Sequence, residues 1–563
     1  MKVIIVGGVA GGATAAARLR RNDENAKIII FERTGYISYA NCGLPYYIGG
    51  VITDRRALTL QTPESFGRRF NVDVRVRREV TDIDTERKTV KVRELNGGRE
   101  YEESYDKLLL SPGAKAAVPP VPGAGGDRTF TLRTVEDTFA IYDFAGKTDA
   151  KKAVIAGGGF IGLETAENLM RRGIAVTLLQ RGTHVMPPFD GDMAEVLHAY
   201  LRAQGLDLRL GVNVAAFEAD DGGITVRTDC GDVRADFAVI ATGVAPDTEL
   251  AVRAGLKTGI RGAIVVSGRM ETSAPDVYAV GDAVQVTEFV GGRDALISLA
   301  GPANKQGRIA ADNMTGGHAE YKGSQGSSVI KLFGMTAACT GLNEKTAAAA
   351  GIACDKVVIA PASHATYYPG AEDMFLKLLF GTDGRVLGAQ IAGGEGVDKR
   401  IDVIATAIRA RMTVRDLAEL DLAYAPPYSS AKDPVNMAGF VAGNVLDGMV
   451  RQYHWHDVPA LSGRKDITML DVRTRGEYAR GRIAGTVNIP LDELRSRLDE
   501  LDRAKPVYVN CHSGLRSYIA CRILTAHGFD CYNLSGGYGF FRYASAGAEY
   551  GGGQTYPCGM PKE

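Results

Sequence analysis

The chain has 563 residues, several times the roughly 100 to 200 residues of one domain, which excludes a protein with a single core. Hydrophobic residues make up 45% and charged residues 23%, so the composition also excludes a disordered or fibrous chain. The 66 basic and 66 acidic residues cancel, which argues against nucleic acid or an anionic membrane as a partner. The 69 glycines predict many tight strand-to-helix turns, and we therefore expect α/β domains.

The eight cysteines are scattered and lack the close pairs that hold zinc or a disulfide framework. We therefore predict no metal site and a cytoplasmic location. Residues 1–21 superficially resemble a signal peptide, but their apolar run stops at Val6 and a helix pattern with basic residues follows. No stretch reaches the roughly 20 apolar residues that span a bilayer, so we expect no membrane segment.

The first residues form the pattern of a dinucleotide site. An apolar strand at residues 2–6 leads into Gly7, Gly8, Gly11 and Gly12, and a second buried strand at residues 27–31 ends in Glu32. Such glycines let the backbone approach a pyrophosphate, the helix N-terminus offers N–H groups, and the acid binds a ribose. The middle glycine of the G-x-G-x-x-G pattern is Val9 here, so the motif alone is also compatible with a structural turn.

The pattern recurs at residues 152–156, which lead into Gly157, Gly159 and Gly162 and a helix, with the next strand at residues 175–179. Two such sites indicate two dinucleotides. Buried strands also run into glycine turns at residues 108–114 and 239–246, and a third strand delivers Asp282 just after Gly281.

In this order the motifs resemble those of the flavin-dependent pyridine nucleotide disulfide oxidoreductases, over roughly residues 1–450. The resemblance implies that the first fold holds FAD, the second holds NADH or NADPH, and Asp282 binds the flavin chain. It implies these cofactor-binding residues: Gly7, Gly8, Val9, Ala10, Gly11, Gly12, Glu32, Arg33, Asn41, Cys42, Ser111, Pro112, Gly113, Gly281, Asp282 and Pro302 for FAD, and Gly157, Gly159, Phe160, Ile161, Gly162, Glu164, Gln180, Arg181 and Gly243 around the nicotinamide nucleotide. It also implies a domain order: FAD-binding residues 1–115 and 245–327, NAD(P)H-binding residues 116–244, and a dimerisation domain at residues 328–450.

Cys42 lies at the position of the family's redox cysteine. Members that reduce dithiols carry a second cysteine five positions later, where this chain has Tyr47. A lone thiol beside a flavin can instead cycle through a mixed disulfide, a persulfide or a sulfenic acid. A buried structural cysteine is the alternative interpretation.

Single-cysteine members include coenzyme A disulfide reductases, persulfide reductases, and NADH oxidases or peroxidases. Coenzyme A is an anion and needs cations and polar groups near the cysteine. Positions that match the coenzyme A contacts of the first group are Thr14, Arg18, Arg21, Ser38, Asn41, Asn304 and Lys432. For Arg18 and Arg21, a solvated helix end is the alternative.

The segments around Tyr367 and Tyr424 resemble those that place two tyrosines over the active cysteine of the partner subunit, which implies a homodimer. A tyrosine hydroxyl there could stabilise a departing thiolate. For the neighbouring Tyr368, core packing is the alternative.

After a polar connection near residues 451–458, residues 459–563 resemble a rhodanese domain, another α/β unit. A buried strand at residues 506–510 enters Cys511, and the loop from Cys511 to Ser517 precedes a helix. Loop N–H groups, the helix dipole and Arg516 would lower the pKa of the cysteine and hold an anionic sulfur. Cys558 is either a resolving thiol or an exposed cysteine with no role.

The combination resembles coenzyme A disulfide reductase and rhodanese fusions, including NADH-dependent persulfide reductases. It implies that Cys511 accepts sulfane sulfur from a donor, coenzyme A collects it, and Cys42 attacks the coenzyme A persulfide or disulfide, releasing hydrogen sulfide or coenzyme A. Two alternatives are an NADH oxidase or peroxidase that uses a Cys42 sulfenic acid, and a non-enzymatic redox sensor. Because Gln180 and Arg181 stand where NAD-specific folds place an acid, we expect both NADH and NADPH to be used.

Overall fold

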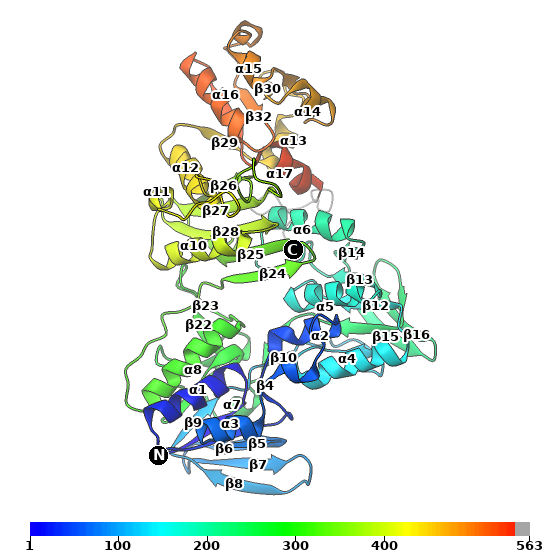
Figure 1. The fold of residues 1–563 in the computed structure, drawn as a ribbon, viewed down its shortest axis with the longest axis vertical. Helices are drawn as coiled ribbons and strands as arrows, with labels where there is room; N and C mark the ends of the chain where they lie inside the picture. The colour runs from blue at the N-terminus through cyan, green and yellow to red at the C-terminus, as the bar shows by residue number, and fades with distance from the viewer. Residues whose placement is uncertain (547–563) are drawn as a thin grey trace. The chain divides into compact units, whose positions relative to one another are not determined.

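The computed structural model describes residues 1–546, which divide into two units (Figure 1). Met1–Arg181 and Val212–Gly326 form the first unit, and Gly182–Gly211 joins the chain from Ser327 onward in the second. Cys558 lies outside the described residues. None of the helices in residues 1–546 combines the length and the apolar character that crossing a membrane requires.

A five-stranded parallel sheet forms the centre of the first unit, in the order β21-β9-β1-β2-β5. Helices α1 and α8 pack side by side against it (Figure 1). Strand β21 follows β9 by more than 160 residues in the chain and leads to Asp282, as the motif predicted. The elements are β1 (Lys2–Val6), α1 (Ala10–Asn22), β2 (Lys27–Glu32), β5 (Asp73–Val76), β9 (Lys107–Leu110), β21 (Val277–Ala279) and α8 (Ala300–Met314).

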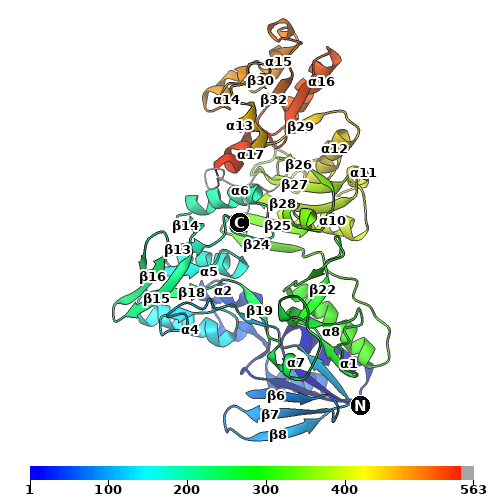
Figure 2. The same cartoon turned by 180° about the vertical axis from the view of Figure 1, so that it is seen from behind.

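The second nucleotide fold of this unit repeats the arrangement, with parallel strands in the order β11-β18-β12-β13. Helix α5 follows β12 directly, as α1 follows β1. The unit also contains two antiparallel three-stranded sheets, β6-β7-β8 and β15-β16-β17, which are seen from behind in Figure 2. The elements are β6 (Arg78–Asp84), β7 (Thr89–Glu94), β8 (Glu100–Ser104), β11 (Thr129–Phe130), α4 (Val135–Lys147), β12 (Lys152–Ala156), α5 (Phe160–Arg171), β13 (Ala175–Gln180), β15 (Val214–Asp220), β16 (Gly223–Thr228), β17 (Val233–Ala235) and β18 (Phe237–Ile240).

The second unit begins with an antiparallel sheet in the order β24-β25-β28-β27-β26. All eight residues of β28 are buried, because α10 and α6 pack against its faces. Helix α6 comes from Gly182–Gly211, so this domain includes a segment that precedes it by more than 100 residues. The elements are α6 (Gly191–Ala203), β24 (Ser328–Leu332), β25 (Met335–Gly341), β26 (Cys354–Ile359), β27 (Phe375–Gly381), β28 (Val386–Gly393), α10 (Val397–Arg409) and α12 (Pro434–Leu446).

A buried ion network ties α6 to this sheet. The Lys377 ammonium of β27 has no solvent exposure and lies 2.9 Å from Asp190, 2.8 Å from Asp192 and 2.5 Å from Glu344. Glu344 also pairs with Lys356 at 2.7 Å. Burial opposes ionisation of Glu344, but the two lysines outweigh burial and lower its pKa to about 2. Removing one partner of such a network is strongly destabilising, because it leaves a buried charge uncompensated.

The C-terminal part of this unit is a parallel sheet in the order β29-β33-β32-β30-β31. Residues 451–453, expected as part of a connection, form the edge strand β29 of this sheet, before the predicted start at residue 459. Phe375 of β27 packs against Phe540 of α17 at a ring separation of 5.6 Å. The elements are β29 (Arg451–Tyr453), β30 (Thr468–Asp471), α14 (Arg475–Ala479), β31 (Val487–Asn488), β32 (Val507–Asn510), α16 (Leu515–Ala526), β33 (Cys531–Leu534) and α17 (Gly537–Ala544).

Candidate active sites

The loop between β1 and α1 is shaped so that only glycine fits at two positions. Gly7 has a φ of +96°, and a Cβ built on it would lie 2.1 Å from the carbonyl oxygen of Ser111. A Cβ on Gly12 would lie 1.9 Å from the Gly7 oxygen. The Glu32 carboxylate accepts hydrogen bonds from the N–H groups of Gly8, at 2.9 Å, and Thr34, at 2.8 Å. This close turn at the N-terminus of a 13-residue helix fits the pyrophosphate and ribose of a dinucleotide such as FAD.

The loop between β12 and α5 has the same construction. Gly157, with a φ of +115°, would place a Cβ 2.2 Å from the Ala241 oxygen, whereas a Cβ on Gly159 would meet no atom within 4 Å. The N–H of Gly158 donates to the side-chain oxygen of Gln180 at 2.9 Å, as Gly8 donates to Glu32 in the first loop. A neutral amide therefore stands where the first fold has a carboxylate. Arg181 is exposed beside it.

Asp282 lies in a short turn, residues 281–283, that is held in place by two polar contacts. The N–H of Gly281 donates to Gln306 at 2.7 Å. The Arg133 guanidinium donates to Asp282 at 3.3 Å. Our sequence interpretation did not include Arg133, because it belongs to no motif and reaches Asp282 across 149 positions of the chain.

Cys42 lies in a one-turn 3₁₀ helix, Asn41–Gly43, that runs into α2 (Leu44–Ile48) with Pro45 in its first turn. Its side chain is exposed, so the interpretation as a buried structural cysteine was wrong. Neighbouring residues nevertheless remove part of the water around the thiol, which raises the pKa of Cys42. The carboxylates of Glu164 and Asp282 add to this shift, whereas Arg133 opposes it. The structure therefore brings Glu164 and Asp282, from two separate motifs, into the electrostatic environment of the predicted nucleophile.

The structure shows the surroundings of each predicted coenzyme A contact and brings two of them together in the first unit. Thr14 of α1 donates a hydrogen bond to Asn304 of α8, which places two of them together. Arg18 forms an ion pair with Asp312 at 2.6 Å, so its charge is already balanced by a carboxylate. Ser38 donates its N–H to the oxygen of Gly8 at 2.8 Å and so adjoins the first glycine loop. Lys432 is exposed in the second unit, and Arg21 is exposed at the end of α1.

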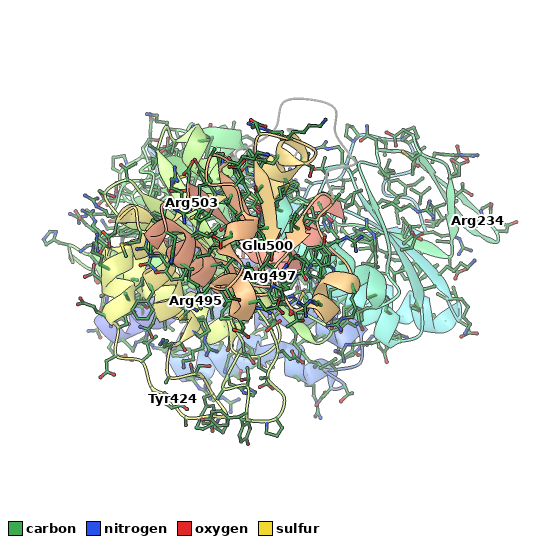
Figure 3. The ribbon with its side chains drawn as sticks, turned by 90° about the horizontal axis from the view of Figure 1, so that it is seen from above. Arg234, Tyr424, Arg495, Arg497, Glu500 and Arg503 are labelled. Atoms are coloured by element: carbon green, nitrogen blue, oxygen red, sulfur yellow. The ribbon has the colours of Figure 1, made fainter. Side chains whose placement is uncertain are left out.

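Tyr367 and Tyr424 lie on loops of the second unit, 57 positions apart, and their hydroxyl groups are 2.8 Å from each other. Tyr367 is 74% exposed and Tyr424 is 46% exposed. Figure 3 shows Tyr424 on a loop at the periphery of the molecule. Tyr368 is also exposed, so core packing does not explain it. The hydrogen bond with Tyr367 raises the pKa of Tyr424. Two hydroxyl groups are therefore presented together on an open surface.

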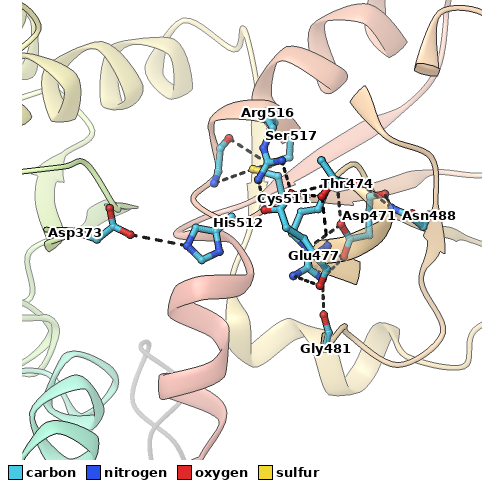
Figure 4. A network of polar contacts seen from close by, with 12 residues as sticks. Asp373, Asp471, Thr474, Glu477, Gly481, Asn488, Cys511, His512, Arg516 and Ser517 are labelled. Carbon is cyan, nitrogen blue, oxygen red and sulfur yellow. Dashed lines mark hydrogen bonds and ion pairs between the residues drawn. The ribbon is translucent and has the colours of Figure 1, made fainter. Parts of the chain in front are cut away.

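Cys511 follows β32 and is fully buried beneath the loop that leads into α16 (Figure 4). Its sulfur accepts hydrogen bonds from the N–H of Gly514, at 3.1 Å, and from the hydroxyl of Ser517, at 3.2 Å. Gly514 has a φ of +95°, a left-handed conformation that favours glycine and turns its N–H toward the sulfur. Donors aimed at the sulfur stabilise its anionic form. The sequence interpretation gave Ser517 no role, although its position in the first turn of the following helix was a usable signal.

Arg516 has a contact that the sequence did not predict. Its guanidinium forms two hydrogen bonds with the carboxylate of Glu477 in α14, at 2.8 and 2.7 Å (Figure 4). This pairing strongly lowers the pKa of Glu477 and raises that of Arg516. The structure thus shows Arg516 anchored to Glu477 near Cys511.

The family comparisons agree with this organisation. Residues 1–307 match the pyridine nucleotide-disulphide oxidoreductase family, residues 327–434 match the dimerisation domain of that family, and residues 455–542 match the rhodanese-like domain.

Individual proteins match across most of the chain. Coenzyme A disulfide reductase of Staphylococcus aureus is 37% identical over 444 residues, which cover 78% of this chain and 99% of that protein. The crystal structure of reduced Bacillus anthracis CoADR-RHD has a TM-score of 0.94 and 46% identity, covering 97% of this chain and 98% of that one. An NAD-dependent persulfide reductase from A. fulgidus has a TM-score of 0.90 and 40% identity, covering 96% and 100%. The chain therefore belongs to the pyridine nucleotide-disulphide oxidoreductase family and carries a rhodanese-like domain at its C-terminal end.

Proposed function

We propose that this protein is an FAD-dependent NAD(P)H oxidoreductase that reduces coenzyme A disulfide or coenzyme A persulfide, with a rhodanese domain that carries sulfane sulfur. One observation carries this proposal: the same chain has Cys42, with no second cysteine in its motif, in the first unit and Cys511, with hydrogen-bond donors directed at its sulfur, in the second. The names of the Staphylococcus and A. fulgidus relatives support it. Its products would be coenzyme A and, from a persulfide, hydrogen sulfide.

In this mechanism the Cys42 thiolate attacks a sulfur of the substrate, forms a mixed disulfide and releases the first thiolate. FAD bound in the first fold would supply electron transfer from the nicotinamide nucleotide to this disulfide. The glycine loops that begin at Gly7 and Gly157 would hold the two dinucleotides, with Glu32 at a ribose and Asp282 at the flavin chain. Thr14, Asn304 and Ser38 would contact coenzyme A, with Arg21 as an exposed cation.

At the rhodanese site, Cys511 would accept sulfane sulfur from a donor and hold it as a persulfide. The N–H of Gly514 and the hydroxyl of Ser517 are already directed at the sulfur and would stabilise the thiolate before and after transfer. Arg516, anchored by Glu477, would add positive potential at the loop.

The experiment that tests the function compares NADH oxidation by the purified holoenzyme under nitrogen and under air. Rapid oxidation under nitrogen only when coenzyme A disulfide or persulfide is added supports the reductase. Rapid oxidation under air without any sulfur compound supports the alternative, an oxidase or peroxidase that uses a Cys42 sulfenic acid. Mass spectrometry of the isolated protein should also find coenzyme A attached to Cys42.

We predict that the two exposed tyrosines act on the cysteine of a partner subunit in a homodimer. A Tyr424→Phe chain and a Cys42→Ser chain, each with low activity, should regain activity when they are mixed, because a heterodimer contains one intact site. The activity of mixtures refolded or exchanged at several ratios measures this. Mixtures that stay as inactive as their components would count against a shared site.

We also predict that both nicotinamide nucleotides are used, because Gln180 offers an amide where an acid would repel a 2′-phosphate. Arg181 is exposed and follows Gln180 in the chain, so it would pair with that phosphate. Arg181→Ala should therefore raise the KM for NADPH by about tenfold, the cost of one charge-assisted contact, and change that for NADH little. Steady-state kinetics with both nucleotides measure the difference, and equal changes would show that Arg181 does not contact the phosphate.

A further inference from the structure

Helices α2 and α5 pack together and bring Tyr46 and Glu164 beside the Cys42 turn. The Tyr46 hydroxyl, one turn after Cys42, donates to the Glu164 carboxylate at 3.4 Å. The packing is close, since a Cβ on Gly49 of the same turn would lie 2.1 Å from the Asn168 side chain of α5. Tyr46 and Glu164 are 118 positions apart in the chain and belong to no common motif.

Within residues 1–546, few charged groups act on this pair. Glu164 faces Tyr46 and Cys42, and the charged residue that acts on it is Glu167 of the same helix. The Glu167 carboxylate is paired with Arg171 at 2.8 Å. Asp282 and Arg133 lie near the thiol and act on it in opposite directions. Loss of solvent is therefore the main influence on the Glu164 carboxyl group. It raises the pKa of Glu164 to about 7, with a smaller increase from Glu167 and an opposing effect of the Tyr46 hydrogen bond.

A disulfide substrate of Cys42 creates a need that this pair can meet. When the Cys42 thiolate attacks one sulfur, the sulfur–sulfur bond breaks and the other half leaves as a thiolate. An alkyl thiolate is a basic leaving group and departs faster when a neighbouring acid supplies a proton. A tyrosine alone holds its proton too firmly at neutral pH to be a net source, whereas a carboxyl group in this environment is still partly protonated.

We propose that Glu164 stores the proton that the departing thiolate takes up, and that Tyr46 passes it on. When Glu164 is protonated, the hydrogen bond runs from its carboxyl group to the Tyr46 oxygen, which leaves the Tyr46 O–H free for the departing sulfur. The Tyr46 O–H bond breaks as the new S–H bond forms, and Tyr46 regains a proton from the Glu164 carboxyl group, which becomes a carboxylate. Solvent then returns a proton to Glu164, so the step needs no oxidant or reductant beyond the disulfide substrate. This inference rests on the proposed reduction of disulfides by Cys42. It makes Tyr46 the proton donor and Glu164 a residue that acts through it.

The first test varies the leaving group. We expect Glu164→Gln and Tyr46→Phe to lower kcat/KM of the holoenzyme for coenzyme A disulfide by about a hundredfold, the size of a general-acid contribution. The mixed disulfide of coenzyme A with thionitrobenzoate should be reduced at nearly the wild-type rate, because its acidic aromatic thiol leaves without a proton. Equal losses with both substrates, or no loss with either, would overturn the proposal.

The second test reads the thiol directly and does not depend on turnover. Because the Glu164 carboxylate raises the pKa of Cys42, Glu164→Gln should shift the pH profile of Cys42 alkylation by iodoacetamide to lower pH. Alkylation above neutral pH then becomes faster although turnover with coenzyme A disulfide becomes slower. Because loss of structure would also expose the thiol, the flavin absorbance and the thermal unfolding temperature of the variant must match those of the wild type. Mass spectrometry of the reduced holoenzyme measures the alkylation. An unchanged or upward-shifted profile would contradict the role of Glu164.

Glu167→Gln is the matched control, since Glu167 is another glutamate one turn further along α5, is paired with Arg171 and does not act on Cys42. Its effect on Glu164 is small, so this variant should change the alkylation profile and the substrate preference far less than Glu164→Gln does. The wild-type protein separates the two hypotheses. If it reduces neither disulfide, the proposed function fails, whereas if it reduces both and the variants show no substrate dependence, only the role of Glu164 and Tyr46 fails.

The pH dependence follows from the same carboxyl group. Glu164 carries its proton below about pH 7 and loses it above, so its contribution to kcat/KM for coenzyme A disulfide should fall as the pH rises through about 7. Glu164→Gln should lack this alkaline decline. A decline of equal size in the variant would assign the titration to another group.

Discussion

Replacing Cys42 with serine is expected to lower the reduction of coenzyme A disulfide and persulfide by at least about a thousandfold, as loss of a catalytic nucleophile typically does. A serine hydroxyl remains protonated at neutral pH and does not form the mixed disulfide. The glycine loop and Glu32, which are predicted to hold the flavin, lie on other segments of the chain, so the variant should still bind FAD. NADH oxidation with each substrate and the flavin absorbance of the purified variant measure the two results.

Cys230→Ser is the control for this variant, because Cys230 is another exposed cysteine of the same unit and belongs to no predicted site. It should retain full activity. Turnover by Cys42→Ser at the wild-type rate would disprove the mechanism, and loss of flavin from it would mean that the substitution disturbs more than the thiol.

Replacing Cys511 with serine should remove sulfur transfer from a thiosulfate-like donor and leave reduction of soluble coenzyme A disulfide within about twofold of the wild type. The physical reason is that the donors around Cys511, Gly514 and Ser517, stabilise a sulfur anion on that residue alone. Cyanide-dependent release of thiocyanate from thiosulfate measures the first activity, and NADH oxidation with coenzyme A disulfide measures the second.

For this variant the control is Cys354→Ser, which removes a half-buried thiol from β26 of the same unit and should affect neither activity. Equal loss of both activities in Cys511→Ser would contradict the assignment of two separate sites. If the variant retains both activities, a residue other than Cys511 must accept the sulfur.

Much of this organisation could be predicted from local sequence, because glycine loops and the strands before them are local features. A side chain at Gly7 or Gly157 would collide with backbone, so the fold requires glycine at both positions. Those glycines can be read directly from the sequence. The fold class, the two nucleotide folds and the rhodanese-like domain were confirmed for that reason.

The partners of the site residues were harder to predict, since pairing across the chain leaves no local pattern. Arg18 pairs with Asp312, 294 positions away, a contact that the sequence did not predict. Arg516 pairs with Glu477 through a contact between two helices, which the sequence also did not predict. Tyr46 lies close to Cys42 in the chain, but nothing in the sequence indicated a function for it, because the role that we propose depends on Glu164 of another segment.

The network around Lys377 also bears on how the protein is made. Met193 and Leu197 of α6 are fully buried against a sheet that is encoded more than 130 residues later. At roughly 5–20 residues per second, a ribosome delivers β27 on the order of ten seconds after α6. During that interval this helix, with Asp190 just before it and Asp192 in its first turn, has emerged without the lysine that will neutralise the two carboxylates. The first unit can fold before the rest of the second unit has been synthesised, so the second unit is completed late in biosynthesis. Until then, the apolar face of α6 is a surface that a chaperone would bind.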